Sequence, residues 1–447
     1  MHDSADRVLA VDAYRGIVML LLLPDLHGGF SFYRLAERFP DSPVWTALGR
    51  LFTHAQWSGC TVWDLIQPSF CLLVGIAMPL SASARRARGD TRFEIAAHVF
   101  LRAAALFFLA LIFEISFRTL IDELWPVIVL AAGLSIHPAV ATALGLRSRA
   151  QRRRAELVWS AVVVTTTAVW VYSHLDAVGN YNLTTIFSQL GLAIPFAFLL
   201  VGRGTRVQLG VAFAILALSW LAYATYPPAG PGFDAAAVGV APTDQWYTGF
   251  FAHWNKSANF GSAFDLWFLN ALPRSEVFQY DANGLATLNF VTTIATIVFG
   301  VMCGELLKSG RAPREIRNTL LKAAVAAIAL GVATTPLCPL VKSLWTPSWT
   351  LFSAGITLLA LAGLYHACDI RGHRAWAVPL KVLGTNSILL YVFSESYRWW
   401  FLSLPKRVLG IDVGAGPYGP LQESVVFAIM LALIALVLYR LRIFVRL

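Results

Sequence analysis

Long apolar runs separated by short polar segments dominate the hydrophobic pattern from one end of the chain to the other. A helix that crosses a bilayer needs about 20 mostly apolar residues, and runs of that length recur twelve times. Because lipid cannot satisfy backbone polar groups, each spanning run is expected to be helical. The predicted spans are 14–30, 62–82, 98–117, 124–144, 156–174, 185–201, 208–226, 286–307, 318–340, 349–368, 380–402 and 421–440.

This pattern predicts an all-α protein: a polytopic transmembrane helix bundle of about 10–12 spans, forming a single membrane domain over residues 1–447. The fourth and fifth runs are the weakest, because Pro126 and Pro138 interrupt one and polar residues thin the other. With 57% hydrophobic and 13% charged residues, the composition excludes an ordinary soluble protein. Asp3, Asp6 and Asp12 precede the first run, and the N-terminal region shows no small-residue cleavage site, so that span is expected to be retained.

Lysine and arginine gather in one set of alternate loops, whereas the opposite loops hold only scattered cations. The positive-inside rule therefore places both termini in the cytoplasm, and the expected location is the inner (plasma) membrane. These clusters account for the net charge of +10, so nucleic acid is not an expected partner. The basic positions are Arg85, Arg86, Arg88, Arg92, Arg147, Arg149, Arg152 to Arg154, Arg203, Arg206, Lys308, Arg311, Arg314, Arg317, Arg371 and Arg374.

Two long loops, 31–61 and 227–285, then face outward. The second contains the consecutive residues His253, Trp254 and Asn255. Aromatic faces and amides suit the binding of a sugar ring and its hydroxyls, which makes these three residues candidate substrate ligands. A cap whose aromatic side chains lie in the membrane interface is the alternative, and both interpretations stay open.

The stretch between His54 and Pro68 places an imidazole and a carboxylate directly before an apolar run. Histidine is the side chain best suited to move a proton near neutral pH, so His54 is a candidate general base. Asp64 is a candidate to orient that histidine. Thr61 and Asp64 also have the spacing of a capping box at a helix start, and the two roles are compatible. Trp57 is a candidate substrate contact, although an interfacial anchor is its commoner role.

The pattern His54-x-x-Trp-x-Gly-x-Thr-x-x-Asp-Leu, followed by Pro68 and Phe70, resembles the signature of the heparan-α-glucosaminide N-acetyltransferase family. The N-terminal segment Val11-Asp-Ala-Tyr-Arg-Gly16 is similar to the second marker of that family. Weaker similarity extends to 289–304 and 383–388.

This resemblance implies a multi-pass acetyltransferase that uses acetyl-coenzyme A from the cytoplasm and an amino sugar on the outer side. It also maps the active-site histidine of the family onto His54. The family has an asparagine late in the first span, where this chain has Leu26. Asp25 or His27 is expected to take its place as a substrate ligand.

Charged and polar residues in or near the spans supply further candidates, because such residues are costly in lipid and usually functional. Arg15 and Arg102 are candidate ligands of an anionic donor; for Arg15 an intrahelical pair with Asp12 is the alternative. Asn386 is a third candidate donor ligand, with a hydrogen bond between helices as the alternative. Glu395 is a candidate substrate ligand on the outer side.

The predicted function is an integral membrane acyltransferase in which His54 acts either as the base or as a nucleophile that carries the acetyl group. One alternative is a transporter or flippase without covalent chemistry, which the lack of a repeated half disfavours. The other is a polysaccharide O-acyltransferase. No metal site is expected, because the five cysteines show no zinc spacing. The expected partners are membrane lipid and a small-molecule or glycan acceptor, and a homodimer is left open.

Overall fold

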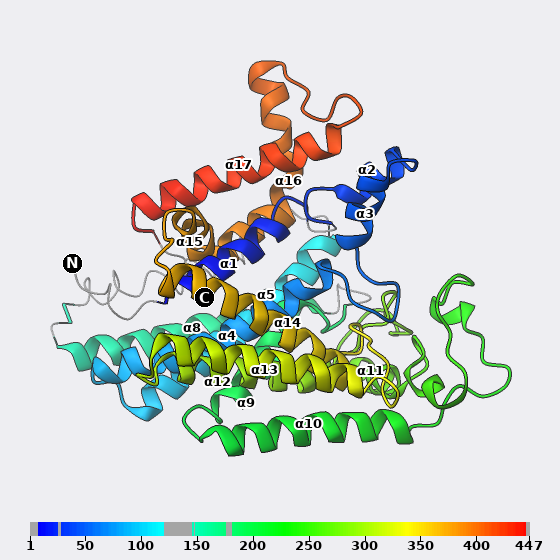
Figure 1. The fold of residues 1–447 in the computed structure, drawn as a ribbon, viewed down its shortest axis with the longest axis horizontal. Helices are drawn as coiled ribbons and strands as arrows, with labels where there is room; N and C mark the ends of the chain where they lie inside the picture. Colours follow the sequence, from blue (N-terminus) through cyan, green and yellow to red (C-terminus); the bar gives the residue numbers. More distant parts are fainter. Residues whose placement is uncertain (1–7, 26–27, 120–144, 147, 176–180, 444–447) are drawn as a thin grey trace.

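A computed structural model describes residues 8–25, 28–119, 145–146, 148–175 and 181–443 (Figure 1). Helices make up the regular structure of this part of the chain, and it contains no strand, which confirms the predicted all-α class. Within the same residues, eight helical segments are long and apolar enough to cross a membrane. They are formed by α4 (Ile66–Ala87), α5 (Arg92–Thr119), α8 (Arg149–His174), α10 (Thr205–Thr225), α12 (Asn289–Leu307), α13 (Pro313–Ala333), α14 (Pro347–Tyr365) and α17 (Gly419–Arg440).

Two further helices depart from the predicted spans. Helix α1 (Leu9–Leu22) begins before the predicted span 14–30 and ends well short of it. Pro24 follows two residues later, and proline has no backbone N–H with which to continue the helical hydrogen bonds. Helix α9 (Ile186–Phe198) is also shorter than the predicted 185–201. The predicted span 124–144 lies outside the described residues.

The predicted span 380–402 falls on two helices rather than one, and the pair together is long and apolar enough to form a span. Helices α15 (Ala377–Thr385) and α16 (Ser387–Leu409) meet at an angle of 73°. The break falls at Asn386, whose backbone leaves the helical region at φ −120° and ψ 39°. Asparagine is a weak helix former that competes for backbone hydrogen bonds, so a break at this residue is physically reasonable.

Glycines bring helices into close contact at the centre of the bundle. Gly75 of α4 lies against the backbone of Ile297 in α12, and Gly300 of α12 lies against the backbone of Leu72. A methyl group at either glycine would overlap the facing carbonyl group. Small residues at such crossings are typical of membrane helices, because packing rather than hydrophobicity holds helices together in lipid.

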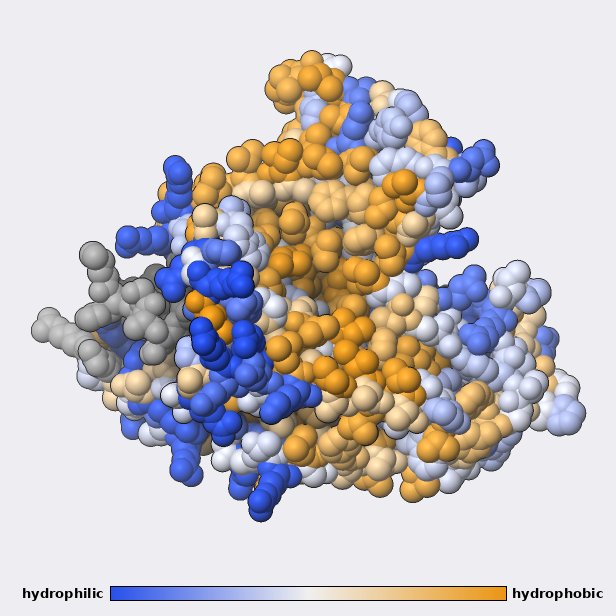
Figure 2. Space-filling view, in the orientation of Figure 1, coloured by the Kyte–Doolittle hydropathy of each residue, from blue (hydrophilic) through white to orange (hydrophobic). Residues whose placement is uncertain are grey.

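An apolar band separates two hydrophilic ends of the molecule in the space-filling view (Figure 2). Exposed side chains such as Val325 on α13 and Leu433 on α17 belong to the outer helices that form the apolar surface. Strongly hydrophilic side chains gather at one end of this view. Together with the long apolar helices, this distribution is that of a multi-pass membrane protein.

The two long loops both contain ordered helical structure. Loop 31–61 contains α2 (Phe32–Arg38) and α3 (Pro43–Leu51). Loop 227–285, here called the cap, contains η3 (Ala236–Val238), η4 (Gly249–Trp254) and α11 (Phe260–Asn270). The completely buried side chain of Trp254 anchors the cap.

Candidate active site

A reciprocal pair of hydrogen bonds organises the chain just before α4. The Thr61 backbone N–H donates to Asp64 Oδ2 at 3.0 Å, and the Asp64 N–H donates to Thr61 Oγ1 at 3.3 Å. This geometry confirms the capping box predicted from the spacing of the two residues. The short helix η1 (Trp63–Leu65) then leads directly into α4.

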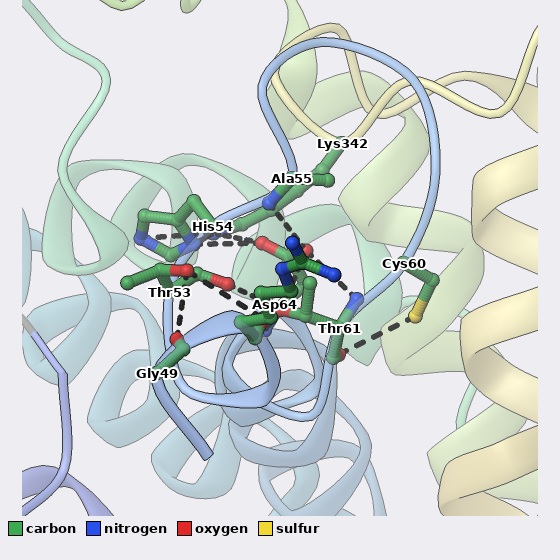
Figure 3. A network of polar contacts seen from close by, with 9 residues as sticks. Gly49, Thr53, His54, Ala55, Cys60, Thr61, Asp64 and Lys342 are labelled. Atoms are coloured by element: carbon green, nitrogen blue, oxygen red, sulfur yellow. Dashed lines mark hydrogen bonds and ion pairs between the residues drawn. The ribbon is translucent and has the colours of Figure 1, made fainter. Parts of the chain in front are cut away.

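Asp64 also contacts His54 across the loop (Figure 3). The distance from Asp64 Oδ1 to His54 Nδ1 is 2.7 Å, and Asp64 Oδ2 accepts the Ala55 N–H at 3.2 Å. The Asp64 carboxylate is fully buried, whereas 56% of the imidazole surface is exposed. The two roles considered for Asp64, helix cap and partner of His54, therefore coexist in one side chain.

Lys342 completes the cluster and was not among the residues predicted from sequence. Its Nζ lies 2.9 Å from His54 Nδ1 and 3.3 Å from Asp64 Oδ1. Burial lowers the pKa of this ammonium group below its usual range, while the Asp64 carboxylate acts against that change. In the sequence Lys342 follows the apolar run 318–340, and only its isolation as a cation could have drawn attention to it.

A cavity of about 1830 Å³ begins at this cluster and extends along the bundle. His54, Lys342 and Trp63 line one end, here called the His54 end. The opposite end, here called the basic end, is lined by the cationic side chains of Arg15, Arg85, Arg102, Lys308, Arg440 and Arg442. Since Asp64 precedes α4 and Arg85 lies in its last turn, a rise of 1.5 Å per residue separates the two ends by roughly 30 Å.

The wall between the two ends of the cavity is mostly apolar. Side chains of α4, including Phe70 and Val74, face residues of α9 and α16 there. Such a lining suits a flexible, weakly polar chain, whereas the ends suit charged and hydrogen-bonding groups. The cavity therefore joins the His54 cluster to a surface rich in cationic side chains, and its lining includes both arginines predicted to bind the donor.

Three other predicted residues lie beside the cavity rather than on its surface. Asp25 is 2% exposed and accepts a hydrogen bond of 2.5 Å from Ser31 Oγ. Asn386 is buried at the break between α15 and α16, where its side-chain amide donates to the Ile443 carbonyl at 3.1 Å. Glu395 contacts Tyr391, which itself lines the cavity. His27 lies outside the described residues.

The remaining candidates hold the cap together. Trp57 is 4% exposed and its indole N–H donates to the Trp254 carbonyl at 3.0 Å. The Asn255 side chain makes two hydrogen bonds with the Tyr247 backbone. His253 Nδ1 lies 2.6 Å from the carbonyl oxygen of Tyr226. The Trp57 contact connects loop 31–61 to the cap, whereas the contacts of Asn255 and His253 stabilise the cap itself.

The chemistry of the neighbouring groups narrows the choice of reactive side chain. Cys60 lies near Asp64, and burial together with that carboxylate raises the pKa of its thiol to about 12. A thiol in that state is a poor nucleophile at neutral pH. Within the described part of the chain, no group of three or more His, Cys, Asp or Glu side chains is arranged to hold a metal ion. The imidazole of His54 is thus the group at this end best suited to proton or acyl transfer.

Comparison with known proteins places this geometry in context. No protein-family model matches the chain. The heparan-alpha-glucosaminide N-acetyltransferase of Homo sapiens is 24% identical over 453 residues, which cover 98% of this chain. The protein of the same name from Mus musculus is 26% identical over 105 residues, which cover 24% of this chain and 13% of the mouse protein.

This chain is related to them at the level of a family. It spans only 59% of the length of the human protein, although the similarity runs along nearly all of the shorter chain. The apolar helices and this similarity together support a multi-pass membrane protein. The donor and the acceptor belong to the proposal below.

Proposed function

We propose that this protein is an integral membrane acetyltransferase that moves an acetyl group from acetyl-coenzyme A to an amino sugar or glycan. The observation that carries the proposal is the continuous cavity, because it connects His54 to a distant group of arginines. The family-level relationship to an N-acetyltransferase supports the same reaction class.

The basic end would bind the phosphate-bearing part of the donor. Guanidinium groups bind phosphate oxygens in a bidentate manner, and Arg15 and Arg102 both line that end. By the positive-inside rule we assign the basic end to the cytoplasm, where both termini would also lie. The His54 end then faces outward, and the acceptor enters from that side.

The apolar wall would hold the extended arm of the donor so that its thioester reaches His54. With Asp64 accepting the proton of Nδ1, the imidazole presents the lone pair of Nε2 to the cavity. That lone pair can remove the proton of an acceptor amine, or it can attack the thioester to form an acetyl-histidine. Both routes use the same orientation of the ring.

Purified protein in proteoliposomes provides the direct test. Acetyl-coenzyme A carrying a labelled acetyl group is added on one side, and glucosamine is added on the other. We expect N-acetylglucosamine to form when acetyl-coenzyme A has access to the basic end. Transport of glucosamine without acetylation would contradict an acyltransferase and favour a transporter. Acetylation of a hydroxylated glycan but not of glucosamine would change the acceptor to an oxygen nucleophile.

A further inference from the structure

Lys342 is held beside His54 by a backbone connection between two distant parts of the chain. The residues lie 288 positions apart. Ser58, in the loop that follows His54, forms an antiparallel bridge with Val341. The Gly59 N–H also donates to the Leu340 carbonyl at 2.9 Å. The residue next to this bridge is Lys342, so its position relative to His54 is determined by backbone hydrogen bonds.

Buried side-chain hydrogen bonds make the Lys342 segment rigid from the other side as well. Thr346 Oγ1 and Ser348 Oγ each donate to the Pro339 carbonyl at 2.9 Å. The Val341 N–H donates to Thr346 Oγ1 at 3.1 Å. Only 16% of the Lys342 side chain is exposed. A cation fixed in this way needs little reorganisation when negative charge develops beside it.

The position of the ammonium group relative to the ring points to a catalytic role. Nζ lies 2.9 Å from Nδ1 of His54, the nitrogen that faces Asp64, and 3.4 Å from Nε2, so the ammonium group is within contact distance of both ring nitrogens. An ammonium group has three N–H donors. One can serve Asp64 Oδ1, which leaves donors for a ligand at the His54 end.

We propose that Lys342 is a catalytic residue that stabilises the oxyanion formed when the acceptor attacks the acetyl group. This inference rests on the proposed function. Acyl transfer needs a base and also a donor for the developing negative charge. His54 supplies the base, and Lys342 is the cation next to it that lines the same end of the cavity.

The step balances without any other reactant. The acceptor nitrogen forms a bond to the thioester carbon while the carbonyl electron pair moves to oxygen, where the Lys342 ammonium stabilises it. His54 Nε2 takes the proton from nitrogen. When the tetrahedral intermediate collapses, the carbonyl re-forms, the carbon–sulfur bond breaks, and the coenzyme A thiolate receives the proton from His54.

A simpler role for Lys342 is to neutralise the buried charge of Asp64. The two roles make different predictions in a double-mutant cycle. If Lys342 is only a counter-ion, it is no longer needed once Asp64→Asn has removed the negative charge. Lys342→Met would then cause no further loss of kcat in the Asp64→Asn background. An oxyanion donor is needed in both backgrounds. The double variant carries no unpaired buried charge, which protects its folding.

The experiment measures kcat and KM for acetyl-coenzyme A and glucosamine in wild type, Lys342→Met, Asp64→Asn and the double variant. Lys322→Met, an exposed lysine away from the cavity, is the matched control. We expect Lys342→Met to lower kcat by about 10²-fold in both backgrounds, with little change in KM. Lys342→Arg retains the charge and should recover part of the rate.

A loss confined to the background with Asp64 would overturn the proposal and leave Lys342 as a counter-ion. A change in KM alone would overturn it as well, because it would indicate ground-state binding. If wild type itself produces no acetylated sugar, both the proposed function and the role of Lys342 fall. If wild type is active and Lys342→Met leaves kcat unchanged, only the proposed role of Lys342 is contradicted.

Discussion

The Asp64 carboxylate holds His54 through Oδ1 at 2.7 Å and the Thr61 backbone through Oδ2 at 3.0 Å. One buried side chain therefore closes the loop from residue 54 to residue 64 and orients the imidazole at its start. The carboxylate thus both caps the start of the helix and lies within hydrogen-bond distance of Nδ1 of the proposed base. Its two effects can be separated experimentally.

Replacement of His54 is expected to remove the activity without harming the fold. General-base assistance typically accelerates a reaction by about 10²–10⁴-fold, so His54→Ala should lower kcat by about 10²-fold or more. More than half of the imidazole surface is exposed, so the loss of packing should be small. Acetyl transfer and thermal unfolding in detergent measure the two quantities. His373→Ala, at an exposed histidine that does not line the cavity, is the control, and full activity of His54→Ala would contradict the site.

Asp64→Asn tests the orientation of His54 against helix capping. An amide at this position can still accept one hydrogen bond, but it no longer selects the tautomer with a proton on Nδ1. We expect a loss in kcat of about 10²-fold or more. Thr61→Ala removes the hydroxyl of the capping box while the carboxylate stays.

The Thr61 variant should lose about 1 kcal/mol of stability and keep most of its rate. If both variants lose stability and neither loses rate, then Asp64 is only a cap. Thermal unfolding and steady-state kinetics on the same preparations separate these outcomes.

Arg102→Ala should weaken binding of the donor. A hydrogen bond to a charged group contributes about 1.5–3 kcal/mol, so KM for acetyl-coenzyme A should rise by about tenfold or more. Arg92 lies on the same helix, is exposed and does not line the cavity, which makes Arg92→Ala a matched control. Titration of coenzyme A by calorimetry measures the effect directly. Equal affinity in the two variants would assign Arg102 a structural role.

The orientation in the membrane can be tested without any substrate. In a background without the five native cysteines, Ser83→Cys should react with an impermeant thiol reagent only from the cytoplasmic side. Ala237→Cys, in the exposed part of the cap, should react from outside intact cells. The opposite pattern would place His54 in the cytoplasm and reverse the path proposed for the acetyl group.

The cap should become less stable as the pH rises. Asp265 is 1% exposed, and burial raises the pKa of its carboxyl from 3.8 to about 6. Between those values the folded state holds the proton more tightly than the unfolded state. The contribution of Asp265 to stability is therefore fully present below pH 4 and is lost as the pH rises through about 6. Asp281, whose pKa burial also raises, acts in the same direction.

Asp265→Asn removes the charge and keeps the shape of the side chain. At about 1.4 kcal/mol per pH unit between the two midpoints, the penalty at neutral pH amounts to a few kcal/mol. The variant should therefore unfold at a higher temperature than wild type at pH 7 and at a similar temperature at pH 4. Thermal unfolding over this pH range is the measurement, and a variant that is less stable at pH 7 would show that the ionised form is preferred.

Features that depend on nearby residues were predictable from the sequence. The apolar runs determined the all-α class, because lipid leaves the backbone no partner outside its own helix. The capping box of Thr61 and Asp64 is equally local, since the two residues are three positions apart. The choice of His54 as the reactive group depended on its position before a span and on the family resemblance.

Only the tertiary structure decided which distant residues meet. Lys342 is one isolated cation in the sequence, and no periodicity connects it to His54; a backbone bridge between two loops does so. The break at Asn386 lies in a run that is apolar enough for one straight helix. Hydrophobicity indicates which residues lie in lipid, but it does not indicate where the helix axis changes direction. The cavity that joins Arg102 to His54 is formed between several helices, so its course depends on how those helices pack.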